Sequence, residues 1–157
     1  MKRVVSLLLS ASLLLGLLSA CQKGALSGQD PGEERTALEL ADAALSASGC
    51  DAGGGELEYE YLTAEKGGRE YLTAYLENAY DISGGELLWE DAAVIRATGA
   101  SAFELAILRM EDEGAAVRAA SSLMSYISNR QGDFVGYAPK EADMVANGGI
   151  MQSGPYA

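Results

Sequence analysis

Histidine is absent from this sequence of 157 residues, and with it the side chain that most often serves as a general base in enzymes. Ser-His-Asp and Cys-His catalytic arrangements and the HExxH zinc motif are therefore excluded. Metal binding would have to rest on carboxylates, which favour calcium or magnesium over zinc. We expect no catalytic residue, no metal site and no cofactor, and we predict that the protein is not an enzyme. A pair of carboxylates of the glycosidase type stays open, because its members need not be neighbours in the sequence.

Basic residues are scarce as well. The sequence has 11 lysines and arginines against 23 aspartates and glutamates, which gives a formal net charge of −12. Proteins that bind nucleic acid need a basic footprint for the phosphates, so nucleic acid is excluded as a partner. The same balance excludes an electrostatic attachment to anionic lipid.

The one long apolar run lies at the N-terminus, from Val4 to Leu18, directly after the basic residues Lys2 and Arg3. It is shorter than the roughly 20 residues that cross a hydrocarbon core as a helix, and polar residues follow it from Gln22. A basic start, an apolar run and small residues at its end are typical of an export signal that is cleaved. We therefore predict a signal peptide over residues 1–20.

The end of this signal, Leu18-Ser19-Ala20-Cys21, resembles the lipobox of bacterial lipoproteins. The resemblance implies that Cys21 is lipidated and becomes the first residue after cleavage. Acyl chains such as palmitate would then anchor the protein to the outer, extracytoplasmic face of the cell membrane. Cleavage would leave 9 basic against 23 acidic residues, a net charge of −14. Secretion without lipidation is the alternative, because Ala-x-Ala-like spacing is loosely met before the cysteine.

Cysteine is nearly absent too, since the sequence contains two. With Cys21 bonded to lipid, Cys50 would be the only free thiol, and no intramolecular disulfide could form. A reactive cysteine needs a neighbouring cation or imidazole to lower its pKa. We therefore interpret Cys50 as a tolerated or half-buried thiol.

Beyond the signal we expect a flexible tether over residues 21–35, rich in Gly, Ser, Gln, Asp and Pro, and a single domain over residues 36–157. Apolar residues three and four apart indicate helices, and alternation indicates strands. The predicted helices cover residues 36–48, 70–80, 115–129 and 140–147, and the predicted strands cover residues 56–61, 92–97, 103–110 and 150–152. The fold class is a small α+β domain in which a central antiparallel hairpin of residues 92–97 and 103–110 is packed by helices.

Two of these segments allow a second interpretation. Residues 56–61 could begin a helix, although their alternation favours a strand whose glutamates form a solvated acidic face. A cation site there is disfavoured, because a calcium loop needs ligands on a turning backbone. The helix over residues 70–80 carries an apolar stripe rich in tyrosine. We interpret this stripe as core with hydroxyls reaching water, and a sugar- or peptide-binding surface is the alternative.

The same patterns assign faces to the hairpin and to the longest helix. In the second hairpin strand Phe103, Leu105 and Ile107 face one way, and we expect them to pack on the helix over residues 115–129. The predicted inward face of that helix consists of Val117, Ala120, Leu123, Met124 and Ile127.

Three stretches carry a resemblance to a known family. They are Ala102-Phe103-Glu104-Leu105-Ala106-Ile107-Leu108, Phe134-x-x-Tyr137-x-Pro139 and Gly154-x-Tyr156, and a predicted helix that ends near Arg130-Gln131 stands between the first two. These stretches are similar to a family of bacterial lipoproteins, the domain-of-unknown-function family numbered 4358, which is common in clostridia and their relatives. The resemblance covers residues 70–157 as a family-like core and leaves residues 36–69 outside. It implies a location and a fold and supplies no catalytic residue.

The resemblance also concerns the C-terminus. Members of the family run on after the glycine–tyrosine element with an apolar strand and a helix, whereas this sequence ends at Ala157. It therefore implies a shortened form that lacks its last strand and helix and has an open sheet edge. Such an edge would allow the chain to self-associate.

Two hypotheses for function follow. In the first, the protein is a membrane-anchored, non-catalytic interaction or envelope-accessory module that binds an unknown protein or cell-wall partner. In the second, it is a small-ligand-binding accessory lipoprotein of an uptake system. Solute-capturing lipoproteins usually close two lobes on a cleft, and a chain of this length rarely builds two lobes. Length therefore favours the first hypothesis.

Overall fold

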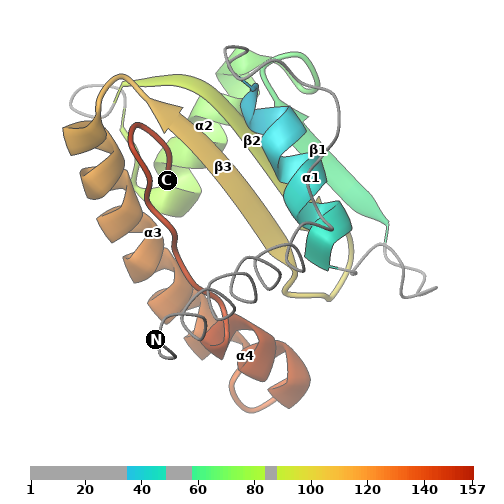
Figure 1. Cartoon of the computed structure of the whole chain (residues 1–157). Helices are drawn as coiled ribbons and strands as arrows, with labels where there is room; N and C mark the ends of the chain where they lie inside the picture. Colours follow the sequence, from blue (N-terminus) through green and yellow to red (C-terminus); the bar gives the residue numbers. More distant parts are fainter. Residues whose placement is uncertain (1–34, 49–57, 84–87) are drawn as a thin grey trace, which may run out of the picture. The chain divides into compact units, whose positions relative to one another are not determined.

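The computed structural model of the chain describes residues 35–48, 58–83 and 88–157. Across these residues the chain forms a three-stranded antiparallel sheet in the order β1-β2-β3 (Figure 1). The strands are β1 (Tyr59–Thr63), β2 (Trp89–Ala97) and β3 (Glu104–Met110). In the central strand β2, Ile95 stands opposite Tyr61 of β1 and opposite Leu105 of β3. The predicted hairpin is thus confirmed, and β2 begins earlier than predicted, at Trp89.

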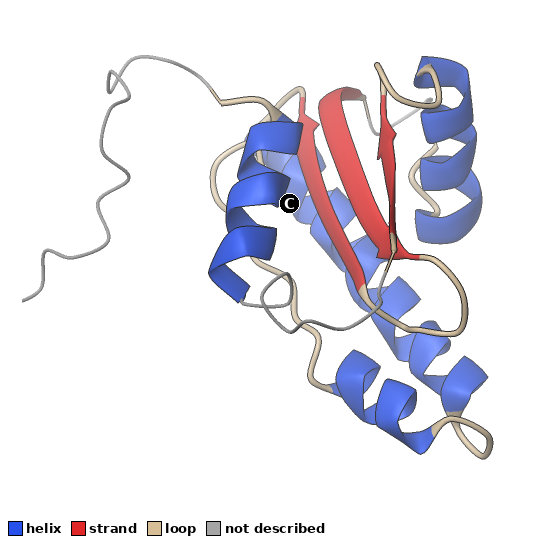
Figure 2. Cartoon of the chain, turned by 90° about the vertical axis from the view of Figure 1, so that its right-hand side faces the viewer, coloured by secondary structure: helices blue, strands red, loops and turns tan. Residues whose placement is uncertain are grey.

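Four helices accompany the sheet in the described residues and make the domain α+β, as predicted. They are α1 (Ala37–Ser48), α2 (Arg69–Tyr80), α3 (Glu113–Phe134) and α4 (Pro139–Ala146). Figure 2 shows the strands between α1 on one face and α2 on the other. α3 packs on α2 and on β3, and α4 packs on α3.

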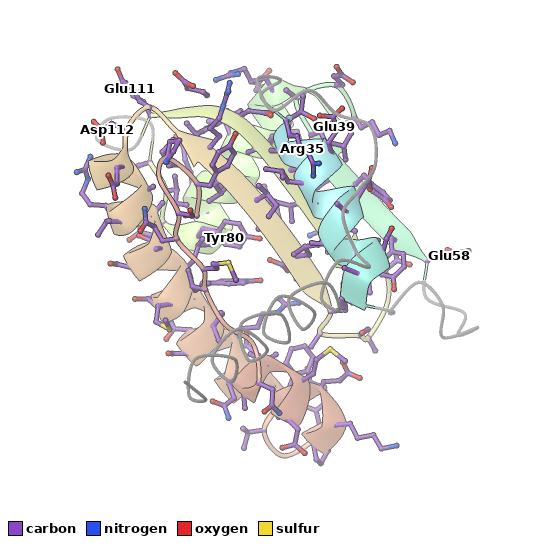
Figure 3. All side chains as sticks on the ribbon, in the orientation of Figure 1. Arg35, Glu39, Glu58, Tyr80, Glu111 and Asp112 are labelled. Atoms are coloured by element: carbon purple, nitrogen blue, oxygen red, sulfur yellow. The ribbon has the colours of Figure 1, made fainter. Side chains whose placement is uncertain are left out.

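Local sequence signals explain where α1 and α3 begin. Thr36 and Glu39 form a capping box: the Glu39 carboxylate accepts from the Thr36 N–H at 2.9 Å, and the Thr36 hydroxyl oxygen accepts from the Glu39 N–H at 3.2 Å. Asp112 caps α3 by accepting from the Ala115 N–H at 2.7 Å. These side chains satisfy backbone donors that have no partner inside the helix. Figure 3 shows Glu39 near the start of α1 and Asp112 at the start of α3.

The core has two halves, one on each face of the sheet. The half that faces α2 and α3 contains Leu72, Leu76, Tyr80, Val94, Leu108, Met110 and Leu123. The half that faces α1 contains Ala37, Ala41, Leu45, Ala93 and Ile95, with Phe103, Leu105 and Ile107 packed against them. Successive side chains along a strand point to opposite faces, so the central strand β2 contributes to both halves.

Of two predictions about α3, the packing of the hairpin strand on it was wrong, and its inward face was wrong at Val117 and Met124 but right at Leu123. Phe103, Leu105 and Ile107 pack on α1, because α1 covers the face to which these alternate residues point. On α3 itself, Val117 is 51% exposed and Met124 is 52% exposed. The residues of α3 that are buried are Ala115, Ala116, Ala119, Leu123 and Phe134. The prediction followed the largest apolar side chains, whereas short alanine side chains let the helix approach the sheet and α2 closely.

The C-terminal segment also differs from the prediction, because residues 150–152 form no strand. The chain turns where Ser153 and Tyr156 exchange two backbone hydrogen bonds of 3.0 Å. Leu108 of β3 and Ala157 then exchange backbone hydrogen bonds of 2.8 and 2.9 Å, and the Met110 N–H donates to the Pro155 carbonyl at 2.8 Å. Figure 1 shows this segment returning from α4 to β3. The outer edge of the hairpin is therefore occupied at residues 108–110.

Candidate functional site

The most unusual side chain in the described domain is Glu104, the first residue of β3. Its carboxylate lies on the same face of the strand as Leu108 and Met110, toward α2 and α3, and the side chain is only 9% exposed. A buried carboxylate is costly unless it is paired or hydrogen-bonded. The partners of Glu104 therefore define the site.

Three tyrosine hydroxyls donate hydrogen bonds to this carboxylate. Tyr75 and Tyr126 donate to Oε2 at 3.3 and 3.0 Å, and Tyr80 donates to Oε1. The Tyr80 ring stands edge-on between the other two, with centroids 5.5 Å from Tyr75 and 4.8 Å from Tyr126. We call Glu104 and these three tyrosines the Glu104 cluster. The expectation that the tyrosines of α2 send their hydroxyls to water is corrected at Tyr75 and Tyr80, which find a carboxylate instead.

The cluster is assembled from three elements. Tyr75 and Tyr80 come from α2, Tyr126 comes from α3, and Glu104 comes from β3. Figure 3 labels Tyr80 at the end of α2, on the far side of the sheet from α1. The rings add apolar burial to the core, and the hydroxyls at their tips supply hydrogen-bond donors to the Glu104 carboxylate.

The surroundings raise the pKa of all three phenols. Burial is the main cause at Tyr80, and the nearby Glu104 adds to it, so the pKa of Tyr80 lies well above the ordinary value of 10.0. Burial and then Glu104 also raise the pKa of Tyr126 and of Tyr75. Phenols with raised pKa values keep their protons at neutral pH. They act there as hydrogen-bond donors and are poorly suited to serve as bases or nucleophiles.

Arg130 lies beside the cluster, one helical turn after Tyr126 on α3. The distance from its Nη2 to Glu104 Oε2 is 3.6 Å. This contact is an ion pair, because it is too long for a hydrogen bond. Its guanidinium stacks near the rings of Tyr126 and Phe134, at 5.6 Å from each centroid. The Nε atom is buried and has no hydrogen-bond partner among the described residues. The Arg130 guanidinium therefore has donors that this part of the chain leaves unused.

A second ion pair lies next to the first. Glu60 of β1 accepts with Oε2 a hydrogen bond of 2.7 Å from Nε of Arg96 on β2, and Nη2 of Arg96 forms an ion pair with the same oxygen at 2.6 Å. The Arg96 guanidinium also lies 5.1 Å from the centroid of the Tyr75 ring. Burial alone would lower the pKa of Arg96, but the hydrogen bonds to Glu60 and Tyr75 outweigh it and raise that pKa. The glutamate predicted to lie on a solvated face thus pairs across the sheet.

These groups surround a hollow of about 320 Å³. It is lined by Glu60, Tyr75, Arg96, Ala97, Thr98, Gly99, Ser101, Glu104 and Arg130. The loop between β2 and β3 forms one wall, and Glu141 of α4 fixes that loop by accepting from the Ala102 N–H at 2.6 Å. A concave site where a few polar groups converge is the usual form of a small-molecule binding site.

A second hollow, of about 520 Å³, lies along α3 and the C-terminal segment. It is lined by Val117, Ala120, Ser121, Met124, Ser125, Ser128, Ile150 and Gln152. The three serine hydroxyls donate to carbonyls of their own helix at 3.1, 3.2 and 3.1 Å. With their protons turned to the backbone, the serines present a weakly polar surface, so this hollow is an apolar groove.

The residues predicted from the sequence to carry function fall outside the part of the chain that the structure describes. Leu18, Ser19, Ala20 and the lipidation candidate Cys21 are outside the described residues, as is Cys50. Glu104 was noted as a mark of family resemblance, but Tyr126 and Arg130 were missed. One signal could have pointed to the site: Glu104 alternates with Ala106, Leu108 and Met110, which puts a carboxylate on an apolar face.

Within residues 35–48, 58–83 and 88–157, no group of histidine, cysteine, aspartate and glutamate side chains is placed to hold a metal ion. None of the helices in those ranges is long and apolar enough to cross a membrane. No model of a protein family matches the chain, and no curated protein or solved structure matches it either.

Proposed function

We propose that this protein is a non-catalytic binding module, anchored by lipid at Cys21 to the outer face of the cell membrane. Support for the anchor comes from the sequence, in the basic start, the apolar run and the Leu18-Ser19-Ala20-Cys21 motif. Support for binding comes from the hollow beside the Glu104 cluster. The single observation that carries the proposal is the guanidinium of Arg130, which lines that hollow and makes no hydrogen bond with the described part of the chain, its Nε being buried without a partner.

This observation favours the small-ligand version of the proposal, the second of the two sequence hypotheses. Buried polar groups in folded proteins nearly always have hydrogen-bond partners, so a buried donor without one calls for an explanation. A ligand that enters the hollow could accept hydrogen bonds from the guanidinium of Arg130, whose side chain is 25% exposed. A volume of about 320 Å³ lies at the lower end of the range for ligand pockets, which suits a small molecule.

The chemistry of the site supports binding rather than catalysis. The three phenols nearest to the hollow have raised pKa values and keep their protons. The Glu104 carboxylate already accepts three hydroxyl hydrogen bonds and lies beside Arg130. A general base needs a free lone pair within reach of the substrate, and these contacts take three of the roughly four acceptor sites of the Glu104 carboxylate.

Binding of a protein partner, the first sequence hypothesis, is favoured by a different feature. The groove along α3 exposes Met124 and Val117 by about half, and apolar side chains grouped in this way are typical of protein interaction sites. The groove does not overlap the residues that line the hollow. Substitutions in one can therefore be made without altering the other.

Cell fractionation tests the anchor. Replacing Cys21 with alanine should move the protein from the membrane to the soluble fraction, or leave it unprocessed, because the acyl chains would be lost. Cys50→Ala is the matched control and should leave the protein at the membrane. A Cys21→Ala variant that is processed normally and remains membrane-bound would refute the anchor.

A thermal-shift screen of the purified chain tests binding. The compounds are sugars, amino acids, short peptides, cell-wall fragments and divalent cations. A ligand that binds only the folded state at 100 times its dissociation constant adds about 2.7 kcal/mol to the free energy of unfolding. We expect one class to raise the melting temperature of the natural chain and to lose that effect in Arg130→Met. A screen in which no class does so would refute the small-ligand proposal.

A further inference from the structure

We infer that the hollow beside the Glu104 cluster binds a small zwitterion, a molecule with one carboxylate and one ammonium group such as a free amino acid. This inference rests on the small-ligand version of the proposed function and names the ligand class of the same site. It assigns the carboxylate of the ligand to Arg130 and its ammonium to Glu60. Both residues line the hollow, and they come from α3 and β1 respectively.

Arg130 is suited to hold the carboxylate. A guanidinium offers five N–H donors in a planar fork that matches the two oxygens of a carboxylate. Within the described residues the Arg130 side chain makes no hydrogen bond, and its nearest carboxylate, Glu104, stands 3.6 Å away. Glu104 cannot satisfy Arg130 fully, because its oxygens already accept from three tyrosine hydroxyls. A carboxylate in the hollow would supply the missing acceptors.

Glu60 is suited to hold the ammonium. Its hydrogen bond from Arg96 Nε and its ion-pair contact with Arg96 Nη2 both involve the same oxygen, Oε2. The other oxygen, Oε1, accepts no hydrogen bond from the described part of the chain. The side chain is 40% exposed, so this oxygen can receive a donor from solution. An ammonium group offers three donors and no acceptor, which complements a free carboxylate oxygen.

The charges around the hollow favour a ligand without net charge. Its lining contains two carboxylates, Glu60 and Glu104, and two guanidinium groups, Arg96 and Arg130, which sum to zero. A simple anion would be repelled by a chain whose net charge is −12. A simple cation would leave the donors of Arg130 unused. A zwitterion offers a carboxylate to Arg130 and an ammonium group to Glu60, and it adds no net charge to the site.

Isothermal titration calorimetry on the detergent-purified full chain tests the assignment of each end. The first probes are the standard amino acids. The one that binds best is then compared with its N-acetyl form, which lacks the ammonium, and with its amide, which lacks the carboxylate. Each blocked form should bind about tenfold more weakly or worse, because it loses hydrogen bonds between charged groups.

Two substitutions separate the ends. Arg130→Met should weaken binding of the amino acid and of its N-acetyl form and leave binding of the amide unaffected. Its control is Lys140→Met, which removes the same charge from the exposed surface of α4. Glu60→Gln should weaken binding of the amino acid and of the amide and leave binding of the N-acetyl form unaffected. Its control is Glu65→Gln, at an exposed residue. If Arg130→Met fails to fold, the Glu60→Gln series still decides, because Glu60 is partly exposed.

Three results would overturn the inference. They are equal binding of the blocked forms, effects of Arg130→Met and Glu60→Gln no larger than those of their controls, and an absence of binding by all amino acids. If a different class from the thermal-shift screen binds in an Arg130-dependent way, the inference fails and the small-ligand proposal stands. If no class of compound binds, both the inference and the small-ligand proposal fail.

Discussion

Replacing Glu104 with glutamine tests the idea that one carboxylate organises the core face between α2 and α3. The substitution keeps the volume of the side chain, so it creates no cavity. It replaces one of the two accepting oxygens with an NH₂ group that can only donate. All the partners of Glu104, the three tyrosine hydroxyls and Arg130, are donors in the natural chain.

The size of the effect follows from the hydrogen bonds. If the amide oxygen takes the place of Oε2, Tyr75 and Tyr126 keep an acceptor, but the hydroxyl proton of Tyr80 loses its own. Tyr80 is only 1% exposed, so no water molecule can take the place of the lost acceptor. A buried donor without a partner costs about 1–3 kcal/mol, and the two remaining bonds fall from charged to neutral strength at about 1 kcal/mol each. We expect Glu104→Gln to lower the free energy of unfolding by about 3–5 kcal/mol.

Urea denaturation followed by circular dichroism measures this loss. With a slope of about 1.5 kcal/mol per molar urea, the midpoint should fall by about 2 M or more. Glu60→Gln is the control, because it breaks a partly exposed ion pair worth about 0–1 kcal/mol. A loss below about 0.5 kcal/mol for Glu104→Gln would show that the tyrosine hydroxyls find other partners, and would refute the role of the carboxylate.

Three further predictions concern stability. The folded-state pKa of Tyr80 is raised above its ordinary value of 10.0. The stability that the protonated Tyr80 contributes is therefore fully present below about pH 10 and is lost as the pH rises toward the folded-state pKa. The free energy of unfolding, measured in denaturant titrations, should therefore fall above pH 10, and it should fall more steeply with pH in the natural chain than in Tyr80→Phe. Equal pH dependences in the two proteins would contradict this. Ile95 of the central strand is fully buried, so Ile95→Ala should cost about 2–5 kcal/mol. Val117 is half-exposed on α3, so Val117→Ala should stay within about 0.5 kcal/mol. Equal losses in a urea melt would contradict the packing described for α3. Asp112→Ala should cost about 1 kcal/mol in the same assay, because the Ala115 N–H loses its cap, and Asp112→Asn should retain most of the stability; an alanine variant as stable as the natural chain would contradict the cap.

Self-association through a sheet edge stays a prediction. In β3 the residues 108–110 already pair with the chain's own C-terminal residues, so association would have to use another part of an edge. Sedimentation velocity over a range of protein concentrations measures it directly. A single monomer species at every concentration would contradict it.

The sequence determined most elements of this fold because they have strong local signals, whereas the strand predicted over residues 150–152 does not form. The period of the apolar residues separated helices from strands, and the hairpin of β2 and β3 followed from two apolar runs around a glycine-containing loop. The start of α1 was readable because Thr36 and Glu39 stand three residues apart, as a capping box requires. Such signals act between residues a few positions apart, which is why they can be read without the fold.

Only the tertiary structure decided which faces meet and what the buried carboxylate does. The alternation of β3 shows that Phe103 and Glu104 point to opposite faces, but the position of α1 decided which helix covers Phe103. The partners of Glu104 lie more than 20 residues away on two helices. No sequence period links residues so far apart. Their meeting depends on how closely α3 packs on α2 and β3, which small alanines permit, and the site at Arg130 exists only because of that packing.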